Sequence, residues 1–268
     1  MVAMMKKLLL PFILCLIVIS TSFGQSSRND YKKIDYIKVD QEHLDQFIQL
    51  TEKQLKPKVS ALIESDSFLS WSLYKVQYPG GEESGYNFVS VTAASSIDTF
   101  SEQFASVTAP DYVPESVGTN GQNQFGHISS VVKSEIWKVE NNIEADSLSG
   151  PSKFMTMDYM NVSPGKSPDY LMLEDEIAKP IHIERIEDRQ MDDWEVYSLI
   201  LPGGINYGYN YATGNHFEKL GHVEFGFNDE IIKQAIGENS NIPELFNTIY
   251  TTRDLVKREL WQLIDHVQ

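Results

Sequence analysis

The sequence has little cysteine and few basic residues. Its single cysteine, Cys15, lies in the first apolar segment, so the chain has no partner for an internal disulfide and no set of thiolate metal ligands. Lysine and arginine number 22 against 38 acidic residues, which gives a net charge of −16 at pH 7. Such a surface repels phosphate backbones and anionic lipids, so nucleic acid is not expected as a partner.

Several catalytic signatures are also missing. The sequence contains no Gly-x-Ser-x-Gly turn, no His-Glu-x-x-His helix, no Gly-x-x-x-x-Gly-Lys loop and no calcium-binding loop. These absences argue against serine hydrolases, zincin proteases and nucleotide-dependent enzymes. No cofactor is expected, and no metal site, because the five residues between His216 and His222 do not place both on one helical face.

The N-terminus has the pattern of an export signal. Lys6 and Lys7 precede an apolar run over residues 8–19, and small residues follow up to Gln25. The run is short for a membrane span and no stop-transfer charges follow it, which favours a signal peptide over residues 1–24 rather than an uncleaved anchor. We expect cleavage near Gln25 and a periplasmic or secreted protein that no longer contacts the membrane. The cleaved chain would keep 20 basic and 38 acidic residues, a net charge of −18.

The chain contains an internal duplication. Residues 36–87 align without a gap on residues 159–210 at a constant offset of 123 residues. A match of this length in register indicates a tandem repeat of one unit. The matched landmarks are Lys56-Pro57 with Lys179-Pro180, Trp71 with Trp194, Tyr74 with Tyr197, Pro79-Gly80-Gly81 with Pro202-Gly203-Gly204, and Gly85-Tyr86-Asn87 with Gly208-Tyr209-Asn210.

Each copy predicts the same order of elements. A strand around residues 36–39 or 155–162 is followed by a long helix, then by two aromatic and β-branched runs joined by a Pro-Gly-Gly turn, which is typical of a hairpin. A less regular helical region follows, at 97–107 or within 229–250. The unit closes with a strand that carries Lys-x-Glu-x-Trp in both copies.

The long helix has marked features in both copies. In the second copy we expect Ser167 as its N-cap and Pro168 at its first helical position. Pro57 and Pro180 lie inside the helical pattern, where proline removes a donor and clashes with the preceding turn. A kink or a break is therefore expected at the same place in both copies.

The order strand, helix, hairpin, helix, strand is that of a ferredoxin-like βαββαβ unit, which leaves one face of its sheet uncovered. The predicted fold class is α+β, with two repeats at 25–140 and 153–268 joined by a linker at 141–152. With its Lys-Pro, Trp, Pro-Gly-Gly and Tyr-Asn landmarks, the chain resembles the dimeric α/β-barrel superfamily, including NIPSNAP-like and antibiotic-biosynthesis-monooxygenase-like domains. The resemblance implies that the two repeats pack sheet to sheet as an internal pseudo-dimer. Two independent domains with separate cores are the alternative.

Candidate site residues are richest in the second copy. His182, Glu184 and Arg185 lie on the helix after Pro180, where the first copy carries apolar residues. They form either a site with a proton-exchanging histidine or a solvated helix face with an exposed ion pair.

The strands of the second copy supply aromatic and polar candidates. Trp194 and Tyr197 are three residues apart and must point to opposite faces of the sheet. Tyr207, Tyr209 and Tyr211 alternate and are expected on one face, as a pocket lining or a wet interface. Asn210, like Asn87 in the first copy, is either a structural tie or a ligand contact. The ligand-binding candidates are Trp194, Tyr197, Tyr209, Asn210 and Arg185.

The resemblance also suggests activities. Haem-degrading relatives use a strand Asn, a strand Trp and a helix His. Asn161 lies at the end of a predicted strand, but the third strand has tyrosine in place of tryptophan, so the pattern is not met. Other relatives are monooxygenases that need no cofactor and hold their substrate in an apolar pocket.

Three functions follow from these observations. The first is binding of a small, largely apolar molecule in a cavity between sheet and helices. The second is a cofactor-independent oxygenase-like or isomerase-like enzyme acting through His182, Glu184, Tyr197 and Asn210. The third is a non-catalytic interaction scaffold.

Overall fold

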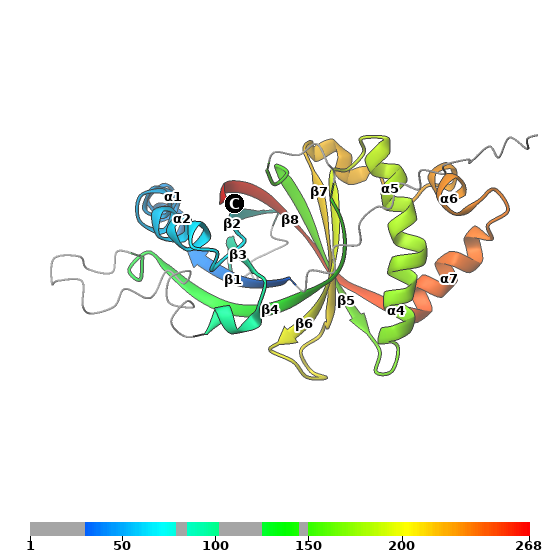
Figure 1. Ribbon diagram of the computed structural model, residues 1–268, viewed down its shortest axis with the longest axis horizontal. Helices are drawn as coiled ribbons and strands as arrows, with labels where there is room; N and C mark the ends of the chain where they lie inside the picture. Colours follow the sequence, from blue (N-terminus) through cyan, green and yellow to red (C-terminus); the bar gives the residue numbers. More distant parts are fainter. Residues whose placement is uncertain (1–29, 79–84, 102–124, 145–149) are drawn as a thin grey trace, which may run out of the picture.

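The computed structural model describes residues 30–78, 85–101, 125–144 and 150–268 (Figure 1). The predicted signal peptide, the first Pro-Gly-Gly turn, most of the helical region expected at 97–107 and part of the predicted linker lie outside these residues. Among the described helices, none is long and apolar enough to cross a membrane.

The two copies repeat one order of elements. The first copy supplies β1 (Tyr31–Val39), α1 (Leu44–Leu50), α2 (Lys56–Glu64), β2 (Ser70–Gln77), β3 (Phe88–Ala94) and β4 (Ser129–Glu144). The second supplies β5 (Phe154–Val162), α4 (Ser167–Leu173), α5 (Lys179–Glu187), β6 (Asp193–Leu201), β7 (Tyr211–Phe217), α6 (Asp229–Ile236), α7 (Ile242–Thr252) and β8 (Arg253–Val267). Short 3-10 turns lie at Gln41–His43, Ile97–Phe100 and Leu220–Glu224.

All eight strands close into one barrel in the order β1-β3-β2-β8-β5-β7-β6-β4. Two antiparallel pairings join the copies, β4 with β6 and β2 with β8. The barrel interior is a single cluster of buried side chains from both copies, so the alternative of two separate cores is wrong. The fold is α+β, two tandem ferredoxin-like repeats packed as a single-chain α/β barrel. Helices α1 and α2 lie outside the first copy's strands, and α4 to α7 outside the second's (Figure 1).

The long helix of each copy continues through its proline without a break. A π-helical segment, Thr51–Leu55 in the first copy and Glu174–Ala178 in the second, directly precedes the helix that begins at Lys56 or Lys179. The wider π turn accommodates the missing donor and the ring of Pro57 or Pro180. The expected break is therefore replaced by a π-helical segment, at the same place in both copies.

The start of α4 differs from the prediction. Lys166 is the N-cap residue, and Ser167 is already helical and makes no capping hydrogen bond. The Lys166 carbonyl accepts from the Tyr170 N–H at 2.9 Å, which is the first bond of the helix. Strand β4 continues to Glu144, into the segment predicted as a linker, because its last residues pair with β6.

The predicted division of the hairpin aromatics between two faces is confirmed. Trp71 and Trp194 pack toward the helices, whereas Tyr74 and Tyr197 lie in the barrel interior. The three alternating tyrosines do not share a face. Tyr209 packs in the barrel, but Tyr211 lies in the cluster beneath the helices, because β7 begins only at Tyr211 and the preceding Gly208 has a left-handed φ of 97°.

Candidate functional site

Two cavities in the described part of the chain are candidates for a site, and each is lined by residues of the diverged second copy. One, of about 260 Å³, lies between the second copy's sheet and its helices and is called here the sheet–helix cavity. The other, of about 410 Å³, lies inside the barrel and is called the barrel cavity.

The sheet–helix cavity has a largely apolar wall formed by β5 to β7, the π segment before α5, and the 223–227 loop. Two of its lining residues, Thr156 and Ala178, are smaller than their counterparts Lys33 and Leu55 in the first copy, which releases space between sheet and helix. The apolar part of the lining is Met160, Leu173, Ile177, Ala178, Phe217, Val223, Phe225, Phe227, Phe246 and Ile249.

Trp194 lines this cavity, and its buried indole N–H has no hydrogen-bond partner among the described residues. In the first copy the matching Trp71 Nε1 donates to Ser90 Oγ at 2.9 Å. The residue that replaces Ser90 is Thr213, and Trp194 does not reach it. A buried donor without an acceptor costs free energy, so this atom marks the place where a ligand acceptor would be stabilising.

Two arginines add further donors. Arg185 uses Nη1 for a 3.1 Å contact with His182 Nδ1 and Nη2 for the backbone carbonyl of Phe225, while its Nε has no partner in the described residues. The Nε of Arg253 is in the same state, and both residues line the cavity. Three residues that line this mainly apolar space therefore each carry a buried N–H group without an acceptor in the described residues.

His182 is enclosed rather than solvated. Its ring packs between Trp194 and Phe227, with centroid separations of 5.2 and 5.1 Å. Burial, with a smaller contribution from Arg185, holds the pKa of His182 well below its ordinary value, so the imidazole is neutral at pH 7. Because Nδ1 accepts from Arg185, the ring proton belongs on Nε2.

Two carboxyl groups line this cavity: Asp158, which is paired with Arg258 at 2.6 Å, and Glu174. Glu174 lies in the π segment before α5, where the first copy has Thr51. Burial raises the pKa of Glu174 to about 7. The group therefore exchanges a proton near neutral pH.

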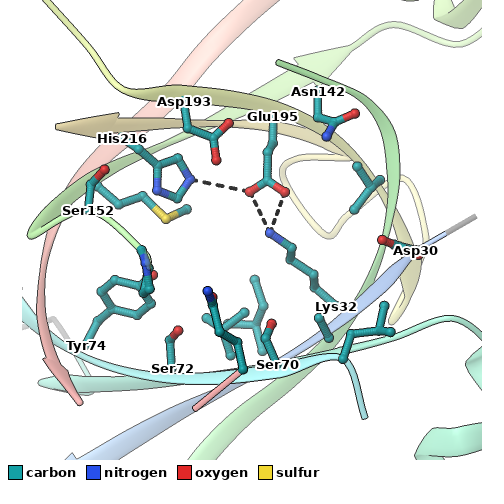
Figure 2. Close-up of a pocket in the computed structure, with 18 of the residues that line it drawn as sticks. Asp30, Lys32, Ser70, Ser72, Tyr74, Asn142, Ser152, Asp193, Glu195 and His216 are labelled. Atoms are coloured by element: carbon teal, nitrogen blue, oxygen red, sulfur yellow. Dashed lines mark hydrogen bonds and ion pairs between the residues drawn. The ribbon is translucent and has the colours of Figure 1, made fainter. Parts of the chain in front are cut away.

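The barrel cavity holds a compact charged cluster (Figure 2). Lys32 Nζ, from β1, donates to both carboxylate oxygens of Glu195, at 2.6 and 2.5 Å. Glu195, on β6, also accepts from the Tyr197 hydroxyl, and His216 Nε2 on β7 lies 3.4 Å from Glu195 Oε2. Asp193 completes the group on the same wall, and one ligand atom each from Asp193, Glu195 and His216 lie within 4.8 Å of one another.

This cluster is not duplicated. The internal counterparts of Asp193, Glu195 and His216 are serines 70 and 72 and Ala93, and the counterpart of Lys32 is Met155. Ser70, Ser72 and Ala93 line the same cavity from the opposite side, whereas Met155 pairs with His216 between β5 and β7 and lies beside it. The barrel cavity thus has Asp193, Glu195 and His216 on one wall and small side chains on the other, from which Lys32 reaches across to Glu195 (Figure 2).

The charges of the cluster stabilise one another. Burial alone would raise the pKa of Glu195, but Lys32 and His216 hold that pKa far below its ordinary value. Burial likewise opposes protonation of His216, yet Asp193 and Glu195 raise the pKa of its imidazole. At neutral pH Glu195 is therefore ionised.

The sequence candidates are distributed over several places. His182, Arg185 and Trp194 meet in the sheet–helix cavity, so the alternative of a solvated helix face does not hold for His182 and Arg185. Tyr197 lies in the barrel cavity. Glu184 points away from both cavities, and its carboxylate accepts from Gln234 Nε2 at 2.6 Å.

The remaining candidates have structural partners. Tyr209 donates to Glu135 at 2.5 Å within the barrel. Asn210 binds both backbone groups of Val162 at 2.8 Å, as Asn87 does with Val39, which matches the interpretation as structural ties.

The histidines weighed for a metal site are separated. His216 lines the barrel cavity, whereas His222 packs against Phe225, with ring centroids 5.6 Å apart. The strand residue Asn161 is exposed and lines neither cavity.

Sequence reasoning missed Glu174 and the charged cluster of the barrel. The signal was present, because Glu174 and the three second-copy members of the cluster each replace a smaller or uncharged residue of the first copy, and Lys32 is matched by a neutral methionine in the second. Comparing the strands of the two copies, and not only their long helices, would have found them.

Comparison with known proteins supports the fold. No family model and no curated protein sequence matches the chain. Among solved structures, a protein assigned as a monooxygenase from Fusobacterium nucleatum is 9% identical with a TM-score of 0.53, and the match covers 90% of this chain and 94% of that one. A heme-binding protein from Thermus thermophilus is 10% identical with a TM-score of 0.51, covering 88% and 92%.

A variant of chlorite dismutase from Candidatus Nitrospira defluvii is also similar, at 10% identity and a TM-score of 0.51 over 90% of this chain and 93% of that one. These neighbours are chlorite-dismutase-like and monooxygenase-like members of the dimeric α/β-barrel superfamily. At such low identity the likeness establishes the fold, and activity has to be argued from the cavities.

Proposed function

We propose that the protein binds a small molecule with an apolar body and a hydrogen-bond-accepting head, such as a carboxylate, in the sheet–helix cavity. The observation that carries this proposal is the unpartnered indole N–H of Trp194, since the matching indole in the first copy is satisfied by Ser90. The second copy has lost an internal acceptor, and a ligand would supply one.

The chemistry of the cavity supports both parts of such a ligand. Its aliphatic and phenylalanine lining favours an apolar body. The free Nε groups of Arg185 and Arg253 favour an anionic head, because charge-assisted hydrogen bonds are stronger than neutral ones. The volume of about 260 Å³ lies below the roughly 300–1,000 Å³ of sites for drug-sized ligands, so the ligand is small.

Haem does not fit this cavity. One neighbour binds heme, and His182 is a neutral helix histidine of the kind that can ligate iron. However, its ring is packed by Trp194 and Phe227, its Nδ1 is occupied by Arg185, and the cavity is smaller than a macrocycle requires. The residues and size of this cavity therefore do not support a haem-dependent reaction.

A second candidate function is favoured by Glu174. A buried carboxyl with a pKa near 7 is suited to act as a general base, whereas His182 is too weak a base for that role. In an isomerase-like reaction Glu174 would take a proton from a carbon of the bound molecule and return it to another. Arg185 and Arg253 would stabilise the intermediate anion.

The test uses benzoate as the acidic probe and toluene as the matched neutral one. We expect benzoate to shift the Trp194 indole N–H resonance in NMR spectra, and Trp194→Phe to weaken benzoate binding by roughly tenfold, the value of one good hydrogen bond. Trp71→Phe, the same change in the first copy, should leave the affinity unchanged. Equal binding of toluene and benzoate, or no effect of Trp194→Phe, would contradict the proposal.

A further inference from the structure

We infer that Asp193, Glu195 and His216 form a binding site for a divalent transition-metal cation in the barrel cavity. This site is separate from the sheet–helix cavity and does not depend on the function proposed for that cavity. It would supply two carboxylates and one imidazole, a ligand set that suits Zn²⁺, Mn²⁺ and related ions.

The spacing of the donors fits a shared cation better than a hydrogen bond. Glu195 Oε2 and His216 Nε2 are 3.4 Å apart, beyond the usual range of about 2.7–3.2 Å for an N–H···O bond. Two ligands about 2.1 Å from a metal at tetrahedral angles lie about 3.4 Å from each other. The third donor, from Asp193, is within 4.8 Å of both. A small movement of one side chain therefore brings all three onto one ion.

His216 gives an independent indication. Its Nε2 is buried and meets hydrogen-bond geometry with no group in the part of the chain that the structure describes; its ion-pair neighbour is Glu195 Oε2 at 3.4 Å, and the residue is only 6% exposed. A buried polar atom without a hydrogen bond is uncommon in native proteins. Here the atom lies beside the two carboxylates on the same wall of the cavity (Figure 2), where a metal ion would bind the lone pair of the neutral imidazole.

The internal repeat shows that the fold does not require Asp193, Glu195 and His216. The same barrel accommodates Ser70, Ser72 and Ala93 at the matching positions of the first copy. Carboxylates and an imidazole are thus not needed to close the barrel. Three protein ligands would leave at least one position open toward the cavity for water or a bound molecule, as in catalytic metal sites.

Lys32 is the internal competitor of the cation. Its Nζ bridges both oxygens of Glu195, and so places a positive charge beside the ligands. A metal ion must share Glu195 with this ammonium or displace it. The counterpart of Lys32 in the first copy is Met155, a neutral side chain of similar length. Lys32→Met is therefore a substitution that should strengthen metal binding, an outcome that damage to the fold would not produce.

The experiment measures Zn²⁺ and Mn²⁺ binding to the full chain by equilibrium dialysis and isothermal titration calorimetry. We expect one Zn²⁺ per chain, with Mn²⁺ bound more weakly as the usual order of divalent affinities requires. His216→Ala, which copies Ala93, should weaken Zn²⁺ binding at least tenfold, and Lys32→Met should tighten it severalfold. His222→Ala, outside the barrel cavity, is the matched histidine control.

Circular dichroism and melting curves show whether each variant is folded. If His216→Ala is unfolded, Glu195→Gln replaces it as the weakened variant, since it keeps the size of the side chain. Unchanged affinity in a folded His216→Ala variant, equal losses in His222→Ala, or weaker binding in Lys32→Met would each overturn the inference.

Discussion

The hydroxyl groups of Tyr36 and Tyr159, residues at matching positions of the two copies, lie 2.9 Å apart and form a hydrogen bond where the copies meet. Tyr36 also donates to Glu135 at 2.6 Å, so it must accept its bond from Tyr159. Tyr159 is 3.4 Å from Glu259, the counterpart of Glu135. The pair is therefore symmetric in position but polarised in its hydrogen bonding.

This polarity predicts unequal effects of two equivalent substitutions. Tyr36→Phe removes a bond to a charged carboxylate and should lower the free energy of unfolding by about 1.5–3 kcal/mol, whereas Tyr159→Phe should cost about 1 kcal/mol. Urea denaturation of the two variants measures the difference. A larger loss in Tyr159→Phe would show that the proton is arranged in the opposite direction.

Matched serine and threonine positions test the role of the indoles. Ser90→Ala would leave the buried N–H of Trp71 without an acceptor and should destabilise the protein by about 1–3 kcal/mol. Thr213→Ala should have a smaller effect, because Trp194 makes no bond there. Equal losses in the two variants, measured by chemical denaturation, would contradict this account of the sheet–helix cavity.

The two asparagine ties should behave as independent structural elements. Asn87→Ala and Asn210→Ala each remove a pair of hydrogen bonds to a strand end and should each cost about 1–3 kcal/mol. The ties share no partner, so the double variant should show the sum within about 0.5 kcal/mol. The benzoate affinity of Asn210→Ala is the control. A weaker affinity than that of the wild type would show that Asn210 contacts the ligand.

Glu174 predicts a pH dependence of stability. Its pKa rises from 4.5 to about 7 on folding, so the folded state binds more protons between these values. Stability should then fall as the pH rises from about 4.5 to 7 and level off above, by up to about 3 kcal/mol. The raised pKa of His216 adds a slope of the same sign. The free energy of unfolding is therefore measured against pH for the wild type and for Glu174→Gln, which should show a shallower decrease between pH 4.5 and 7. Identical pH profiles would show that Glu174 does not titrate with a raised pKa.

Much of the fold could be predicted from the sequence, because the duplication fixes two units and the turn chemistry orders their strands. The prediction of a kink or a break at Pro57 and Pro180 gave the right place, and the structure has there a π segment that lets the helix continue without a break. Register and the closure of the barrel depend on contacts between strands of different copies, which local patterns do not contain.

The candidate sites were predictable only in part. His182 and Arg185 stood out because the first copy has apolar residues at those positions. The pairing of Lys32 with Glu195 joins residues 163 positions apart, one from each copy. No spacing rule reaches that far, so the charged cluster appears only when the barrel is closed.

The closed barrel made from two joined copies also has a genetic consequence. In a homodimer of one unit, a substitution that placed glutamate at one wall of the cavity would place a second glutamate opposite, and their repulsion would oppose folding. Fusion of the two units into one gene removes that coupling. Glu195 can arise while Ser72 stays neutral, so one half is free to acquire chemistry while the other preserves the architecture.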